Sequence, residues 1–158
     1  PKPSSAASDV YKRQLKGTDI ATTRKACEKF RYKPVSVMNF LEGTRFTPHK
    51  HDKQQSPFTH LLKPKAGGIS FVLNAMGEHL HKLLDVTICY PKGIPTFWDY
   101  ISGKVQDIKV RVRVLPIDPN LIGDYEDPVF RQRFQSWVNQ LWLDKDVLLT
   151  ELKQGERS

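Results

Sequence analysis

The stretch LLDVTICYP, residues 83–91, combines apolar and β-branched side chains in a nearly unbroken run that ends at a proline. Such a run is typical of a buried strand, and Pro91 closes it because proline has no backbone N–H to give to a sheet. The segment VQDIKVRVRVLPI, residues 105–117, differs, because its apolar residues mostly alternate with polar or basic ones. A period of two predicts a second strand with one apolar face and one wet face.

Helical spacing appears on both sides of these two predicted strands. A long helix is predicted over residues 128–152, with Asp127 before Pro128 as a favourable start. A shorter helix is predicted over residues 69–76, and it ends near Gly77.

Three further elements are predicted nearer the N-terminus. A helix runs from residue 18 or 19 to about residue 30, a strand covers residues 35–41, and residues 47–59 have the composition of a loop. The whole order is helix, strand, helix, strand, strand, helix, which predicts an α/β layer structure.

Length and composition limit the classes of protein to which this chain can belong. One domain is the default for 158 residues, and the net charge of +8 favours anionic partners such as phosphate-bearing substrates, lipid headgroups or nucleic acid. No apolar run approaches the roughly 18 residues that a membrane-spanning helix requires. Cys27 and Cys89 are far apart in apolar surroundings, so we interpret them as reduced core thiols.

The residues Glu42, Gly43, Thr44 and Arg45 follow the predicted strand at 35–41. Glycine permits a close approach of the backbone, threonine adds a hydroxyl, and the arginine fork matches a phosphate with two parallel hydrogen bonds. Glu42 has two possible roles, to hold Arg45 or to accept from a ligand hydroxyl. The motif predicts a site for a phosphate ester of a polyol, and the alternative is a salt-bridged turn without a ligand.

The sequence resembles the glycerolipid acyltransferase family, which includes the lysophosphatidic acid acyltransferases. FLEGTR is similar to the family's Phe-Pro-Glu-Gly-Thr-Arg motif, with Leu41 where proline is commoner. The resemblance extends over residues 16–153 and is greatest to the YihG-like and lysocardiolipin acyltransferase-like branch. Its matching segments, in order, are TTRKACEKFRYKP at 22–34, NFLEGTRFT at 39–47, LLKPKAGGI at 61–69, LLDVTICYP at 83–91 and FQSWVNQLWLDKDVLL at 134–149.

The resemblance implies a fold and an activity. The fold is the C-terminal part of an acyltransferase domain, a mixed sheet flanked by helices. The activity moves a fatty acyl group from acyl-CoA or acyl carrier protein, with no other cofactor and no metal, to a lysophospholipid in phospholipid biosynthesis or remodelling. The family associates the Glu-Gly-Thr-Arg motif with the acceptor's phosphate and glycerol, which carries onto residues 42–45. The implied location is the cytoplasmic face of a bacterial inner membrane.

The family's catalytic pair is a histidine with an aspartate five residues later, and none of the five histidines here fits that spacing. We therefore name no catalytic residue and expect this polypeptide to be an inactive fragment that lacks the upstream motif and membrane anchor. Residues 15–153 are the predicted partial domain. Residues 1–14 resemble a translated adapter sequence, or else form a disordered polar leader, and residues 154–158 form a tail.

Several other features have more than one interpretation. Lys63 and Lys65, in a turn predicted for residues 63–68, either line an approach to the headgroup site or are merely exposed. The histidines of HKHD, residues 49–52, and His60 lack metal-ligand spacing and are interpreted as solvated. The basic positions of residues 109–113 suggest a solvated strand face first, and then a membrane-surface or nucleic-acid binding module without catalysis. The preferred partners are a lysophospholipid, an acyl donor and a membrane surface, without nucleic acid.

Overall fold

The computed structural model describes residues 36–155. The chain divides into two compact units, residues 1–38 and 39–158, and nearly all of the first unit lies outside the described residues. The leader at 1–14, the helix predicted to end near residue 30, and Cys27 therefore lie outside the described residues. All of the described helices and strands belong to the second unit.

The second unit is α/β, as the sequence predicts. Its elements in chain order are α2 (Pro48–Gln54), α3 (Ala66–Met76), the 3-10 turn η1 (Gly77–His79), β1 (Lys82–Cys89), α4 (Phe97–Ile101), β2 (Lys109–Pro116), the 3-10 turn η2 (Pro119–Leu121) and α5 (Pro128–Gln154). In the described residues, β1 and β2 form a two-stranded antiparallel sheet. Its register runs from Lys82 opposite Pro116 to Cys89 opposite Lys109.

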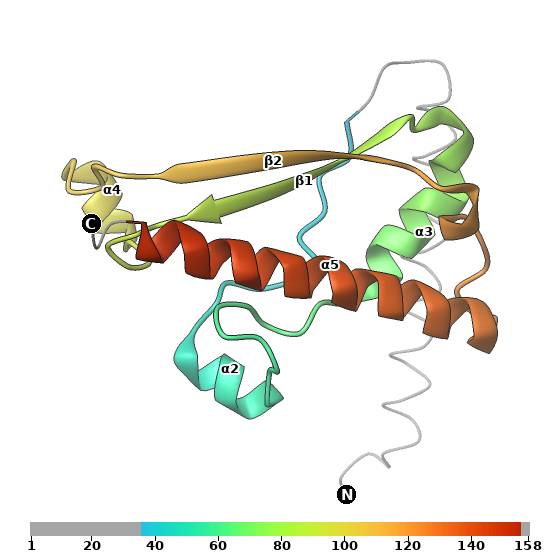
Figure 1. Cartoon of the computed structure of the whole chain (residues 1–158), viewed down its shortest axis with the longest axis horizontal. Coiled ribbons are helices and arrows are strands. Elements are labelled where there is room, and N and C mark those ends of the chain that lie inside the picture. Colours follow the sequence, from blue (N-terminus) through green and yellow to red (C-terminus); the bar gives the residue numbers. More distant parts are fainter. Residues whose placement is uncertain (1–35, 156–158) are drawn as a thin grey trace, which may run out of the picture. The chain divides into compact units, whose positions relative to one another are not determined.

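The long helix α5 runs beside this two-stranded ribbon (Figure 1). The helix begins where the sequence predicts. The Asp127 carboxylate accepts from the backbone N–H of Val129 at 3.0 Å, and Pro128 occupies the first turn. Phe134 and Val138 of α5 are almost wholly buried in the main core. The rest of that core comes from the same helix, from α3 and from the loop before α3, as Phe58, Ala66, Ile69, Leu73, Phe130 and Trp142.

Helix α3 confirms the short helix predicted near Gly77, although it begins at Ala66, inside the predicted turn. Its buried face includes Ile69, Leu73 and Met76, which are the residues that the spacing assigned to one face. At its end, Gly77 packs so closely on Ile122 that a Cβ there would lie 2.5 Å from the isoleucine Cδ1. A side chain at this position would force Ile122 to move.

Two predictions upstream of α3 are wrong. Residues 36–40 are exposed and form no strand, because they have no neighbouring strand in the described part of the chain. Residues 47–59 are not all loop, because α2 occupies their first half. The Thr47 hydroxyl accepts from the backbone N–H of Lys50 at 3.3 Å and Pro48 begins the helix, and these cap signals outweigh the polar composition of the segment.

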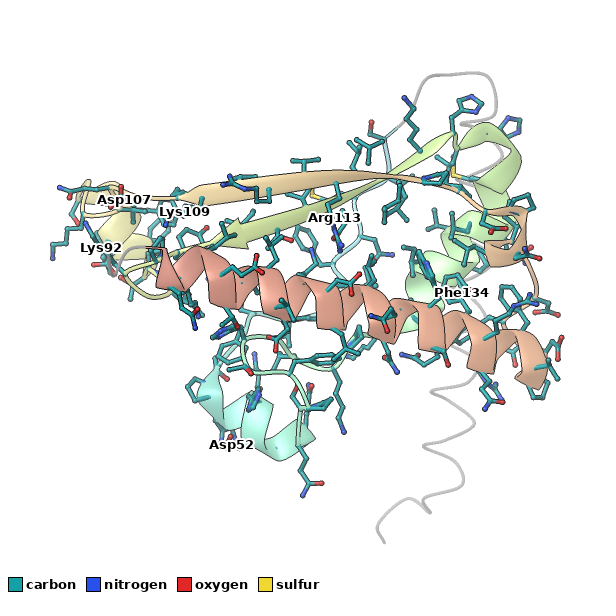
Figure 2. The ribbon with its side chains drawn as sticks, in the orientation of Figure 1. Asp52, Lys92, Asp107, Lys109, Arg113 and Phe134 are labelled. Atoms are coloured by element: carbon teal, nitrogen blue, oxygen red, sulfur yellow. The ribbon has the colours of Figure 1, made fainter. Side chains whose placement is uncertain are left out.

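The two faces of the ribbon also differ from expectation. Strand β1 is not buried on both faces: Asp85, Thr87 and Cys89 face inward, whereas the residues between them are exposed. On β2 the valine side is the exposed one, and Arg113 extends toward α5 (Figure 2). The reason is an ion-pair network, in which Arg113 of β2 and Lys145 of α5 both contact the Asp85 carboxylate. The predicted basic stripe is therefore partly turned inward.

Candidate functional site

The Glu-Gly-Thr-Arg motif forms a tight turn fixed to the start of α3. The backbone N–H of Gly43 donates to the carbonyl of Phe40 at 2.9 Å, and the N–H of Lys65 donates to the carbonyl of Leu41 at 2.7 Å. Gly43 has a φ of 65°, a left-handed conformation that glycine adopts without steric cost. A Cβ there would lie 3.4 Å from the Lys65 Nζ atom, so the lysine side chain passes directly over the glycine.

Helix α2 holds the second half of the motif. The Lys50 Nζ atom donates to the Thr44 hydroxyl at 2.6 Å and to the Arg45 carbonyl at 3.2 Å. Sequence reasoning missed this lysine, because it reaches back to the motif only if residues 48–54 are helical. The signal that would have found it is the Thr47–Pro48 helix start.

Glu42 extends toward α5 and not toward Arg45. Its carboxyl group is partly buried, and this desolvation raises its pKa despite the nearby backbone N–H of Leu62 and the charge of Lys145. The indole N–H of Trp142 also lies near this carboxyl and acts to lower its pKa. Within residues 36–155, however, that N–H makes no well-aligned hydrogen bond. In the same residues Glu42 and Arg45 form no ion pair, so the predicted role of Glu42 in holding Arg45 is not observed.

Arg45 lines an open cavity of about 480 Å³ between the motif, the end of β1, the segment leading into α4 and the end of α5. Within the described residues, the guanidinium of Arg45 makes no side-chain hydrogen bond or ion pair. Glu42, His60 and Lys153 contribute further polar groups to the same cavity. The rest of the wall is largely apolar, with Ile88, Cys89, Tyr90, Ile94, Phe97 and Leu149 among its residues.

His60 and Lys153 form a pair on this wall. The Lys153 Nζ atom lies 3.0 Å from the His60 Nδ1 atom. An ammonium group can only donate, so Nδ1 accepts and the neutral ring carries its proton on Nε2. Burial and the charge of Lys153 lower the pKa of His60 and so favour the neutral ring, against the opposing charge of Asp146. The backbone at His60 is fixed, because its N–H donates to Asp146 of α5 at 2.7 Å.

Sequence reasoning interpreted His60 as merely solvated and missed Lys153, and the two are 93 residues apart in no recognisable motif. The two predicted approach lysines have different positions. Lys65 contacts Gly43 through its side chain, whereas Lys63 is exposed and its backbone N–H donates to Gln54 at 3.2 Å. Neither lysine lines the cavity.

The histidines of HKHD do not face this cavity. Both ring nitrogens of His51 are engaged, with Nε2 lying 2.6 Å from the carbonyl of Phe58 and Nδ1 lying 3.4 Å from the Asp52 carboxylate. These contacts raise the pKa of His51, the carbonyl of Phe58 having the largest effect. Among residues 36–155 no three histidine, cysteine or acidic side chains are grouped as metal ligands.

Comparison with known proteins finds a distant sequence similarity to one class of enzyme. The chain is 23% identical to lysocardiolipin acyltransferase 1 of mouse (Mus musculus) over 139 residues, which cover 80% of this chain and 35% of that protein. The chain is distantly related to acyltransferases. The corresponding protein of chicken (Gallus gallus) is 24% identical over 78% of the chain and 34% of its own length.

The same enzyme of zebrafish (Danio rerio) is 21% identical over 72% of the chain and 30% of its own length. The chain thus spans about a third of the length of the curated relatives that it matches. No family model and no solved structure matches it.

Proposed function

We propose that the protein to which this chain belongs transfers a fatty acyl group from acyl-CoA or acyl carrier protein to a lysophospholipid of the lysophosphatidic acid type. One observation carries the proposal: a single cavity joins a cationic end to an apolar wall. A lysophospholipid has the same two parts, an anionic headgroup and one hydrocarbon chain. The distant relation to lysocardiolipin acyltransferases supports the same class.

The cationic end suits a phosphate group. Arg45 offers a planar fork that can bind two phosphate oxygens, and Lys153 offers a compact ammonium group. His60 adds an N–H at Nε2, because its other ring nitrogen is already occupied by Lys153. In this proposal Gly43 and Thr44 act indirectly, because the left-handed turn at Gly43 and the Lys50 contacts to Thr44 and to the Arg45 carbonyl fix the backbone that carries Arg45.

The chemistry requires a base as well as a binding site. The acceptor hydroxyl attacks the thioester carbonyl, its proton passes to a general base, and the thiol of the donor leaves. His60 is unsuited to be this base, because Lys153 occupies its Nδ1 atom and its Nε2 atom carries a proton. The described residues thus supply acceptor binding in this proposal, and we expect the isolated chain to show no turnover with lysophosphatidic acid and acyl-CoA.

The proposal is tested by binding of lysophosphatidic acid with a short acyl chain, monomeric in solution, measured by calorimetry. Arg45→Ala and Lys153→Ala should each weaken binding about tenfold or more, since each removes a charge-assisted contact to phosphate. Arg131→Ala is the matched control, because Arg131 is an exposed arginine at the opposite end of α5. Equal loss in all three variants would indicate non-specific attraction and contradict the proposal.

A further inference from the structure

Four large apolar side chains around α4 are unusually exposed. Ile94, Phe97, Trp98 and Ile101, here called the α4 ledge, have between 61% and 73% of their surface exposed. Isolated exposed apolar residues are ordinary, but a contiguous group of this kind marks an interaction surface. The group includes a tryptophan, whose ring is favoured where an apolar medium meets water.

The ledge is held by its own local structure. In a capping box, the Thr96 hydroxyl accepts from the backbone N–H of Asp99 at 3.2 Å, and the backbone N–H of Thr96 donates to the Asp99 carboxylate at 2.8 Å. Behind it, the hydroxyl groups of Tyr90 and Tyr100 lie 2.7 Å apart. Three of the four apolar side chains, those of Phe97, Trp98 and Ile101, are therefore presented on a fixed turn of helix.

Charge is distributed unevenly between the two ends of α5. Exposed Lys92 and Lys104 lie near the ledge, and Asp107 is paired with Lys92 at 3.1 Å (Figure 2). The segment leading into the other end of α5 is acidic, with the exposed residues Asp118, Asp124, Glu126 and Asp127. An anionic surface would attract the ledge end and repel the other, which fixes the orientation of approach.

The ledge is continuous with the cavity. Ile94 and Phe97 belong to the ledge and also line the cavity that holds Arg45, whereas Trp98 and Ile101 do not line it. A lipid bilayer in contact with the ledge would therefore meet the apolar wall of the cavity. Within residues 36–155 no helix has both the length and the apolar character needed to cross a bilayer.

We propose that the α4 ledge docks on an anionic membrane surface, with Trp98 and Ile101 entering the headgroup boundary while Lys92 and Lys104 contact lipid phosphates. An acyl chain then passes from the bilayer into the cavity between Ile94 and Phe97. The docking stands without the proposed function, whereas the path of the acyl chain rests on it.

Docking is tested with the 158-residue chain and two vesicle preparations, one of phosphatidylcholine alone and one with an equal part of phosphatidylglycerol. The chain should float with the anionic vesicles and much less with the neutral ones, and added salt should weaken the binding. Trp98→Ser with Ile101→Ser should lower partitioning about tenfold, because both side chains lose their apolar contact with lipid. Lys104→Glu should lower it about fivefold on anionic vesicles alone.

Val129→Ser is the matched control, since Val129 is 73% exposed at the opposite end of α5 and should change nothing. Trp98→Phe should still float, but it should lose the blue shift of tryptophan fluorescence that docking produces in the parent chain. Absence of binding to anionic vesicles would overturn the proposal. So would binding by the double variant equal to that of the parent, or an equal loss in Val129→Ser.

The two proposals fail separately. Short-chain lysophosphatidic acid binds without vesicles, so its dependence on Arg45 tests the headgroup site, and the Trp98→Ser, Ile101→Ser variant should bind it normally. Loss of vesicle docking with retained headgroup binding would refute only the ledge. The opposite result would refute only the acceptor site.

Discussion

The two faces of the β1–β2 ribbon reverse the usual arrangement of a sheet that packs on a helix. The face toward α5 carries Asp85, Thr87 and Arg113, and Asp85 is only 7% exposed. The opposite face is aliphatic, and each of its residues is about half exposed; they are Leu84, Val86, Ile88, Val110, Val112 and Val114. Apolar character therefore does not mark the inner face here.

The inner face is stable because its polar groups satisfy one another. The Asp85 carboxylate accepts from the Arg113 guanidinium at 2.7 and 3.0 Å and from the Lys145 ammonium at 2.5 Å. The same ammonium group donates to the Val86 carbonyl at 2.8 Å and to the Thr87 hydroxyl at 3.0 Å. Buried charges are tolerated when every partner is present, and the loss of one partner leaves the others desolvated and unpaired.

The largest effect is expected from Asp85→Ala. The buried Lys145 would lose its anion and the half-buried Arg113 would keep only Asp144, so the free energy of unfolding should fall by about 3–5 kcal/mol. Chemical denaturation of the 158-residue chain measures this loss. Lys145→Met, which leaves Asp85 paired with Arg113, should cost less, and the double variant should cost less than the two single losses added together. Additive losses would show that the network is not coupled.

An exchange of threonine and valine on opposite faces tests whether the two faces of the ribbon contribute differently to stability. Thr87→Val on the inner face removes an acceptor of Lys145 and should cost about 1–2 kcal/mol, although the new side chain is more apolar. Val112→Thr on the outer face should change the unfolding free energy by less than about 0.5 kcal/mol, because Val112 is already 53% exposed. A larger loss from Val112→Thr than from Thr87→Val would mean that the aliphatic face is covered in solution.

Whether an element of the fold could be predicted from the sequence depends on whether the interactions that form it are local or distant in the chain. The helices α3 and α5 were predictable because their signals are local: spacing of apolar residues, Gly77 at one end and Asp127 with Pro128 at the other. Alternation in residues 109–114 located β2, but it could not choose the buried face, since that choice depends on Asp85 and Lys145, which are distant in the sequence. A pattern of period two is the same whichever face is covered.

The candidate site also combines residues with a local sequence signal and residues that are distant in the sequence. Residues 42–45 were recognisable because they are contiguous, and Gly43 has the backbone conformation that favours glycine. Lys50, which contacts Thr44 and Arg45, came from a helix predicted as loop, and Lys153, which lines the same cavity as Arg45, came from the last turn of α5. Burial of Glu42 beneath Trp142 also had no sequence signal, because it depends on how α5 crosses behind the motif.

The smallest effect concerns two histidines whose environments shift their pKa values in opposite directions. The pKa of His60 is lowered by burial and by Lys153, so the folded state disfavours its protonated form. Its contribution to stability is present above the unfolded pKa of about 6.5 and is lost as the pH falls below it. His51 has a raised pKa through the carbonyl of Phe58, so its contribution is present below about 6.5 and is lost as the pH rises through the folded value.

Replacement of each ring separates these two contributions from the general acid response of the protein. Relative to the parent chain, His60→Gln should gain stability as the pH is lowered from about 7.5 to about 5, whereas His51→Gln should lose stability over the same interval. Thermal unfolding at matched ionic strength measures both differences, and NMR titration of the ring protons gives the pKa order directly. If His60 titrated above His51, the Lys153 contact would not be formed in solution. The cationic wall proposed for the cavity would then lack its third donor, because a ring free of Lys153 has no fixed proton at Nε2.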